Sequence, residues 1–155
     1  MSTGAGYALI MVAAGIGIPV MAAMNSRLGQ ILGNPALAVA VLLCVAAVLV
    51  VATVSATQAS SSDPSSLSVA RFTGAPPLLY GAGVFVAFYL LSITWLAPRI
   101  GVGNAVFFVL LGQLLSTAAI DHFGWLGALQ FKLTPQRLVG LALMAAGIYL
   151  ARRPG

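Results

Sequence analysis

Long uncharged apolar runs constrain this chain more than any other feature. Residues 5–24 and 36–56 contain no charged side chain, and each run is long enough to cross about 30 Å of hydrocarbon as an α-helix. Seven Lys or Arg and two Asp are the only charged residues among 155, whereas about a quarter of a soluble protein is charged. So few charges cannot cover a globule of this size in water. The sequence therefore predicts an all-α integral membrane protein.

Prolines, glycines and polar clusters divide the chain into five predicted transmembrane helices within a single domain, residues 1–155. The sequence Gly-Asn-Pro at 33–35 predicts the end of one helix and the start of the next, which separates the first two spans. The Pro-Arg-Ile-Gly sequence at 98–101 predicts a turn before the fourth span. The serine-rich loop 57–75 is expected to be flexible. Residues 123–131 are apolar but too short to cross, so we expect them to lie along the interface or to re-enter. The predicted spans are 5–24, 36–56, 77–97, 102–121 and 135–151.

The basic residues are scattered and favour neither orientation strongly. With five spans, Arg71, Lys132 and Arg137 fall on the N-terminal side and four other arginines fall on the opposite side. Because the difference in Lys and Arg count between the two sides sets the orientation of a membrane protein, three against four predicts either a weak preference for one orientation or insertion in both. The scatter also builds no basic stripe for nucleic acid. The first apolar run has no Lys or Arg before Arg27, so we expect it to stay in the mature chain rather than act as a signal peptide.

Signals for catalysis and for metal binding are missing from the sequence. It has one cysteine, Cys44, one histidine and two acids, and it has no nucleophile elbow, phosphate loop or metal-ligand spacing. We therefore expect no enzyme activity, no cofactor and no metal site.

No internal repeat is visible, and this bears on transport. Many secondary transporters place their site between two inverted repeats. Five spans would supply one half of such a transporter, and an inverted second copy would supply the other half.

Polar or helix-breaking residues in the first three spans are candidates for substrate binding. Pro19 frees a backbone carbonyl at membrane depth, although a packing kink without a ligand also explains it. Asn25 and Arg27 could contact a polar substrate at the mouth of a cavity, or cap the helix and anchor it to headgroups. Tyr89 suits a neutral or amphipathic substrate, because no acid lies in the centre of any span to balance a cation.

The predicted fourth span carries the densest polar set. Gln113, Thr117 and Asp121 follow one another at intervals of four residues, which places them on one helical stripe, and Ser116 lies beside them. Such groups must bond across helices or line a polar cavity, because lipid offers them no partner. Asp121 and His122 are the candidates for proton coupling, since histidine titrates near neutral pH. A helix-end cap formed by the same two residues is the alternative.

Several short motifs together resemble the YdcZ-like short members of the drug/metabolite transporter superfamily, a group described as inner-membrane exporters. The resemblance covers nearly the whole chain. Its motifs are GIP at 17–19, NSRLG at 25–29, GNPA at 33–36, LAPRIG at 96–101, GQ at 112–113, DHFG at 121–124, and Arg137 with Gly140 and Gly147. Met21 stands where the family usually has a glutamine, which implies a more apolar site or a different partner protomer.

The resemblance implies five transmembrane helices per protomer, half of a ten-helix assembly that works as an antiparallel homodimer or with a paired homologue. It places the site between protomers in the inner (plasma) membrane, with Arg27 and Arg99 as structural anchors. The residues it implies for substrate contact or coupling are Pro19, Asn25, Gln113 and Asp121.

We therefore expect a secondary-active exporter of a small metabolite or drug-like compound that works by alternating access. The resemblance names no substrate. A non-transporting membrane subunit, whose polar stripe binds the helices of another protein, is the competing interpretation.

Overall fold

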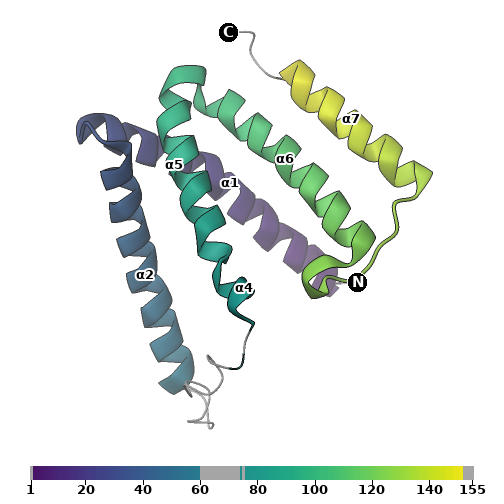
Figure 1. The fold of residues 1–155 in the computed structure, drawn as a ribbon, viewed down its shortest axis with the longest axis horizontal. Coiled ribbons are helices and arrows are strands. Elements are labelled where there is room, and N and C mark those ends of the chain that lie inside the picture. The colour runs from purple at the N-terminus through teal and green to yellow at the C-terminus, as the bar shows by residue number, and fades with distance from the viewer. Residues whose placement is uncertain (1, 60–73, 75, 152–155) are drawn as a thin grey trace. The chain divides into compact units, whose positions relative to one another are not determined.

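The chain is helical wherever it has regular structure among the residues that can be described. The computed structural model describes residues 2–59, 74 and 76–151. Its elements are α1 (Ser2–Ile31), α2 (Pro35–Ala59), α4 (Pro77–Tyr80), α5 (Ala82–Ile100), α6 (Val102–Phe123), the short 3-10 turn η2 (Trp125–Gly127) and α7 (Pro135–Ala151) (Figure 1). No strand occurs within these ranges. The prediction of an all-α fold is confirmed.

Glycine, asparagine and proline residues determine where the helices begin and end. Gly33 follows α1 with a φ of 65°, a left-handed conformation that glycine adopts at little cost. Asn34 caps α2, because its Oδ1 accepts a 2.8 Å hydrogen bond from the Ala36 N–H. Gly101 has a φ of 86° and forms the tight turn between α5 and α6.

The helix α2 extends further than its predicted span. It ends at Ala59, so residues 57–59 of the predicted loop 57–75 are helical. The helix tolerates its last polar residues because the hydroxyl of Thr57 donates to the Val54 carbonyl and that of Thr53 donates to the Leu49 carbonyl. Residues 60–73 and 75, which make up most of the predicted loop, lie outside the described residues.

Four helical stretches are long and apolar enough to cross a membrane, namely Ala5–Ile31, Pro35–Ala59, Pro77–Ile100 and Val102–Phe123. The fifth, α7, has 17 residues and rises about 25 Å, slightly less than the hydrocarbon thickness. Only 6% to 17% of the residues in the four spanning windows are buried. Lipid or another protein must therefore cover most of the apolar surface. The fold is a helical membrane protein with four to five membrane-spanning helices.

The chain divides into two compact units, which we describe separately. Unit 1 contains Met1–Val20 and Leu96–Gly155, and unit 2 contains Met21–Trp95. In unit 1, α6 and α7 form an antiparallel pair (Figure 1). In unit 2, α1, α2 and α5 approach one another around Gly29. The single transmembrane domain over residues 1–155 stays a prediction.

Candidate functional site

Unit 2 contains three buried polar side chains, two on α1 and one on α5. Asn25 and Ser26 are each 5% exposed and Thr94 is 1% exposed, and no other polar residue is buried in the part of the chain that the structure describes. The Asn25 Nδ2 donates a 2.6 Å hydrogen bond to the Thr94 Oγ1, which joins positions 69 residues apart in the sequence. An amide and a hydroxyl inside a membrane protein need such a partner, because lipid provides none.

The close approach of α1 and α5 depends on a glycine. A Cβ atom at Gly29 would lie 3.3 Å from both the Pro35 Cα and the Thr94 Cγ2. Asn25 and Thr94 each lie six residues before the end of their helix, at Ile31 and Ile100. Both polar groups are therefore about 9 Å from a helix end. They lie inside the spans but away from the centre.

Tyr89 on α5 has an unsatisfied polar atom. Its hydroxyl is shielded from solvent and has no hydrogen-bond partner among the described residues, although the rest of the side chain is partly exposed. A buried polar atom without a partner costs about 1–3 kcal/mol. A ligand or another protein surface that offers a polar atom there would remove that cost.

Gln113 and Ser116 are exposed on α6. Gln113 lies at the middle of this 22-residue helix, and Ser116 follows almost one turn later. Neither side chain has a hydrogen-bond partner within residues 2–59, 74 and 76–151. An unpaired amide in hydrocarbon costs several kcal/mol. These two side chains therefore need a polar or water-filled surface beside unit 1.

A charged contact joins the end of α6 to the start of α7 in unit 1. The Asp121 carboxylate forms an ion pair with the Arg137 guanidinium, and their side chains are 23% and 35% exposed. A second guanidinium nitrogen of Arg137 donates a 3.2 Å hydrogen bond to the Phe131 carbonyl. The Arg137 N–H also bonds to the Thr134 Oγ1 at 3.3 Å, which caps the first turn of α7.

His122 organises the same turn through two acceptors. Its backbone carbonyl accepts a 3.0 Å hydrogen bond from the Gln130 side chain, and its Nδ1 accepts a 3.1 Å hydrogen bond from the Leu133 N–H. Because Nδ1 is the acceptor, a neutral ring carries its proton on Nε2. Asp121 and His122 thus lie side by side at the edge of unit 1, partly exposed and already engaged by this chain's own groups.

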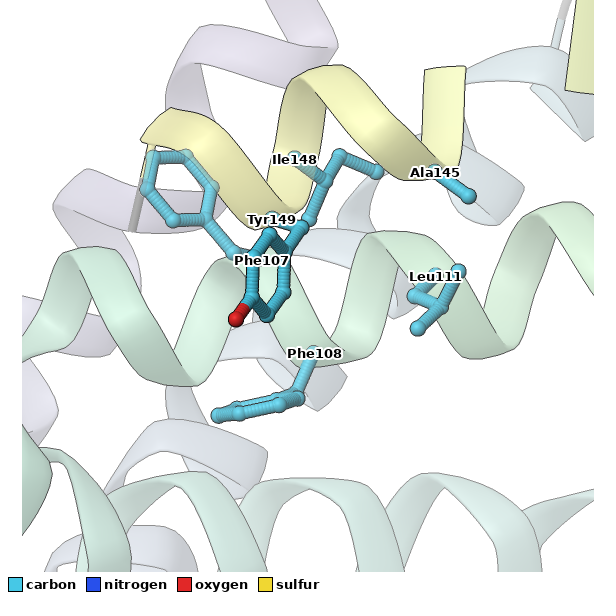
Figure 2. Close-up of a pocket in the computed structure, with 6 residues that line it drawn as sticks. All are labelled: Phe107, Phe108, Leu111, Ala145, Ile148 and Tyr149. Atoms are coloured by element: carbon cyan, nitrogen blue, oxygen red, sulfur yellow. The ribbon is translucent and has the colours of Figure 1, made fainter. Parts of the chain in front are cut away.

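Two apolar cavities lie along α6 and α7 among the described residues of unit 1. Figure 2 shows a pocket of about 50 Å³ between α6 and α7, lined by Phe107, Phe108, Leu111, Ala145, Ile148 and Tyr149. Sites for small molecules usually have volumes of about 300 Å³ or more, so this pocket is a packing gap. A larger hollow of about 360 Å³ along the same helices has no polar side chain in its lining. The described residues include no group of three or more His, Cys, Asp or Glu side chains that could hold a metal ion.

The residues predicted for the site fall in both units. Pro19 lies within the continuous helix α1 and is partly exposed, and Arg27 and Arg99 are exposed close to the ends of α1 and α5. In unit 2, Asn25 forms a hydrogen bond with Thr94, whereas the Tyr89 hydroxyl has no partner among the described residues. The roles assigned to these residues from the sequence stay predictions.

Sequence reasoning missed two of the contact residues, Thr94 and Arg137. Asn25 and Thr94 lie equally far from the ends of α1 and α5. Because the first and third spans cross the membrane in the same direction, the two residues lie at the same depth, and this equal depth could have indicated the contact. Arg137 follows Asp121 across a turn between consecutive helices. The two residues therefore had to lie at the same membrane edge, which could have indicated the ion pair.

One of three comparisons with known proteins found a match. A family model described as "Putative inner membrane exporter, YdcZ" matches residues 6–150, which is nearly the whole chain. No curated protein and no solved structure matches the chain. The family resemblance inferred from the motifs is confirmed. The chain is a multi-pass inner-membrane protein that belongs to the YdcZ family.

Proposed function

We propose that the chain is one protomer of a secondary-active transporter that exports a small metabolite or drug-like compound. The description of its family as "Putative inner membrane exporter, YdcZ" supports a transporter. The observation that carries the proposal is the exposed Gln113 amide at the middle of α6. Beside lipid this amide would be unpaired, whereas a polar pathway through the membrane would solvate it or bring it to a substrate.

The transporter works as an antiparallel homodimer in this proposal. With α7 as a fifth span beside the four longer ones, a protomer has half the helices of a ten-helix transporter. In this proposal a second, inverted copy completes it by placing two α6 helices at a shared pathway. The near tie of basic residues between the two faces supports insertion in both directions. A tag on the C-terminus should be accessible from both faces of the membrane. Accessibility from one face alone would contradict the inverted arrangement.

The substrate class follows from the chemistry of the candidate residues. Asn25, Tyr89, Gln113 and Ser116 offer amide and hydroxyl groups, and Pro19, which has no N–H, leaves the Gly15 carbonyl without its usual helical partner. No carboxylate accompanies them near the centre of any described span, so a cation buried there would have no counter-charge. We therefore propose a neutral or amphipathic substrate, alternately exposed to the two faces of the membrane.

Asp121 and His122 are the proposed coupling residues. Protonation of the Asp121 carboxylate would remove the charge that attracts Arg137 and would release the start of α7 from the end of α6. Proton-driven flux through reconstituted Asp121→Asn protein should fall, because this side chain can no longer exchange a proton. Unchanged flux would remove Asp121 from the coupling mechanism.

A transport assay tests the pathway directly. Radiolabelled chloramphenicol serves as a neutral amphipathic probe and tetraphenylphosphonium as a permanent cation, in proteoliposomes with an imposed proton gradient. We expect protein-dependent flux of the neutral probe that Gln113→Leu abolishes. Gln136→Leu is the matched control, because Gln136 lies in the first turn of α7 rather than at mid-span. Flux of the cation alone would contradict the substrate class, and equal flux through both variants would contradict the role of Gln113.

A further inference from the structure

The segment after α6 exposes an unusual amount of apolar surface. Residues 123–131 follow directly from the end of a membrane-spanning helix, so they lie at a membrane edge. The large apolar side chains of this segment, with their exposed fractions, are Phe123 57%, Trp125 55%, Leu126 76%, Leu129 79% and Phe131 56%. In water these side chains would form a costly apolar patch.

The segment nevertheless has a defined shape. Gly124 and Gly127 adopt left-handed conformations with φ of 64° and 80°, and Leu126 does so with a φ of 58°. A left-handed leucine is uncommon and persists only where the surrounding structure holds it. The rings of Phe123 and Trp125 stack with centroids 5.0 Å apart and planes 16° apart. The turn therefore presents a fixed aromatic surface.

Hydrogen bonds within the protein satisfy key backbone groups of this segment. The Phe131 N–H donates to the Asp121 carbonyl at 2.8 Å, and the Ala128 N–H donates to the Trp125 carbonyl at 3.1 Å. The Phe131 carbonyl accepts from the Arg137 guanidinium at 3.2 Å. These internal partners lower the cost of moving this part of the backbone out of water toward the acyl chains, because an unpaired backbone group is costly there.

We propose that residues 123–131 form a lipid-inserting wedge, a preformed turn that enters the bilayer at the boundary between headgroups and acyl chains. Aromatic side chains at the end of a span favour this boundary. Lys132 is exposed directly after the wedge and can reach headgroup phosphates. Arg137 is the positioning residue, because it binds both the carboxylate of Asp121 and the backbone of the wedge. The inference requires the membrane location alone, so it stands or fails separately from the transport proposal.

Tryptophan fluorescence tests the insertion. The chain has two tryptophans, so Trp95→Phe leaves Trp125 as the single reporter. This variant is reconstituted into phosphatidylcholine vesicles whose acyl chains carry bromine either near the glycerol or near the chain end. We expect strong quenching by the shallow bromines, weaker quenching by the deep ones, little quenching by acrylamide and a blue-shifted emission.

Two outcomes would overturn the proposal. Quenching of Trp125 by acrylamide without quenching by either bromolipid would place the wedge in water. Protection from both kinds of quencher would place it against protein, as in a contact with a second copy. Trp125→Phe, which leaves only Trp95, shows in parallel that the bromolipids reach a reporter elsewhere in the folded protein.

The role of Arg137 has its own test in the Trp95→Phe background. Arg137→Gln removes the ion pair, and we expect shallow-bromine quenching to fall while acrylamide quenching rises. Arg137→Lys keeps the charge and should restore part of the lipid quenching. Gln136→Ala changes an exposed polar side chain beside Arg137 that takes no part in the ion pair, and it should leave the wedge inserted. Lipid quenching that survives Arg137→Gln unchanged would overturn the positioning role.

Discussion

Two polar contacts that join helices in the described part of the chain differ in chemistry and in place. Asn25 and Thr94 form a neutral contact that is almost fully buried within the spans of unit 2. Asp121 and Arg137 form a charged contact that is partly exposed at the end of the helices of unit 1. The difference reflects the surroundings of each contact, which are water and headgroups at the membrane edge and hydrocarbon inside. Charges are tolerated at the membrane edge, where water and headgroups solvate them, whereas only small neutral groups are tolerated inside.

The same difference predicts how much each contact stabilises the fold. Hydrogen bonds between membrane helices contribute about 0.6 kcal/mol on average and about 1–2 kcal/mol in model peptides. An exposed ion pair contributes about 0–1 kcal/mol and is weakened by salt. The buried contact of unit 2 should therefore be the more sensitive of the two to substitution.

The largest effect is expected from Gly29→Leu. A Cβ added at this position would lie 3.3 Å from the Pro35 Cα and from the Thr94 Cγ2. A leucine must therefore push the helices apart and break the hydrogen bond between Asn25 and Thr94. We expect the free energy of unfolding to fall by about 1–3 kcal/mol. Unfolding by sodium dodecyl sulfate in mixed micelles measures it. Gly83→Leu is the control, because a Cβ there meets nothing within 4 Å, and equal losses in both variants would contradict the close approach.

Thr94→Val should have the next largest effect. The substitution keeps the shape of the side chain and removes the acceptor of the Asn25 Nδ2, so we expect a loss of about 1 kcal/mol in unfolding free energy. A double-mutant cycle with Asn25→Leu isolates the hydrogen bond. The double variant should lose less stability than the two single variants together, and strict additivity would show that the two side chains do not interact.

Arg137→Gln should cost less in unfolding free energy, at most about 1 kcal/mol, because both partners of the ion pair are partly exposed. The loss should shrink as salt is added, since screening already weakens the pair. Lys132→Gln removes the same charge without touching Asp121 and is the matched control. A loss from Arg137→Gln that exceeds that of Thr94→Val would reverse the proposed ranking of the two contacts.

The smallest effect on the stability of the fold is expected from Gln113→Leu. The amide has no partner in the described chain, so a leucine of similar size removes no internal hydrogen bond and should leave the unfolding free energy of the protomer within about 0.5 kcal/mol. The same titration measures it. A large loss would show that Gln113 holds the protomer together rather than facing a pathway.

The helices were predictable because length and proline or glycine punctuation depend on local sequence. Pro35 and Pro135 stand at the starts of α2 and α7, and Gly124 follows α6 in a left-handed conformation, which are positions where these residue types are enriched. The end of α2 was predicted too early, because threonine hydroxyls can bond to the helix's own carbonyls and so do not mark a loop.

The partners of the polar residues were harder to predict than the residues themselves. Asn25 and Asp121 stand out as polar residues in an apolar sequence. Thr94 and Arg137 can be recognised as their partners only once the helices are placed together, α1 with α5 and α6 with α7. The conformation of residues 123–131 was also beyond sequence reasoning, because leucine rarely adopts the left-handed conformation that Leu126 has here.

Thiol labelling tests the central claim, a water-accessible pathway along α6, without knowledge of the substrate. Ser116→Cys is combined with Cys44→Ala, and the protein in sealed membranes is treated from one face with a charged, membrane-impermeant maleimide. If both inverted copies open to each face in turn, well over half of the thiols should react. The unsubstituted protein is the control, because its native Cys44, exposed on the apolar helix α2, is expected to face lipid and to stay unreactive. A Ser116→Cys thiol as unreactive as Cys44 would contradict the pathway and favour a non-transporting membrane subunit.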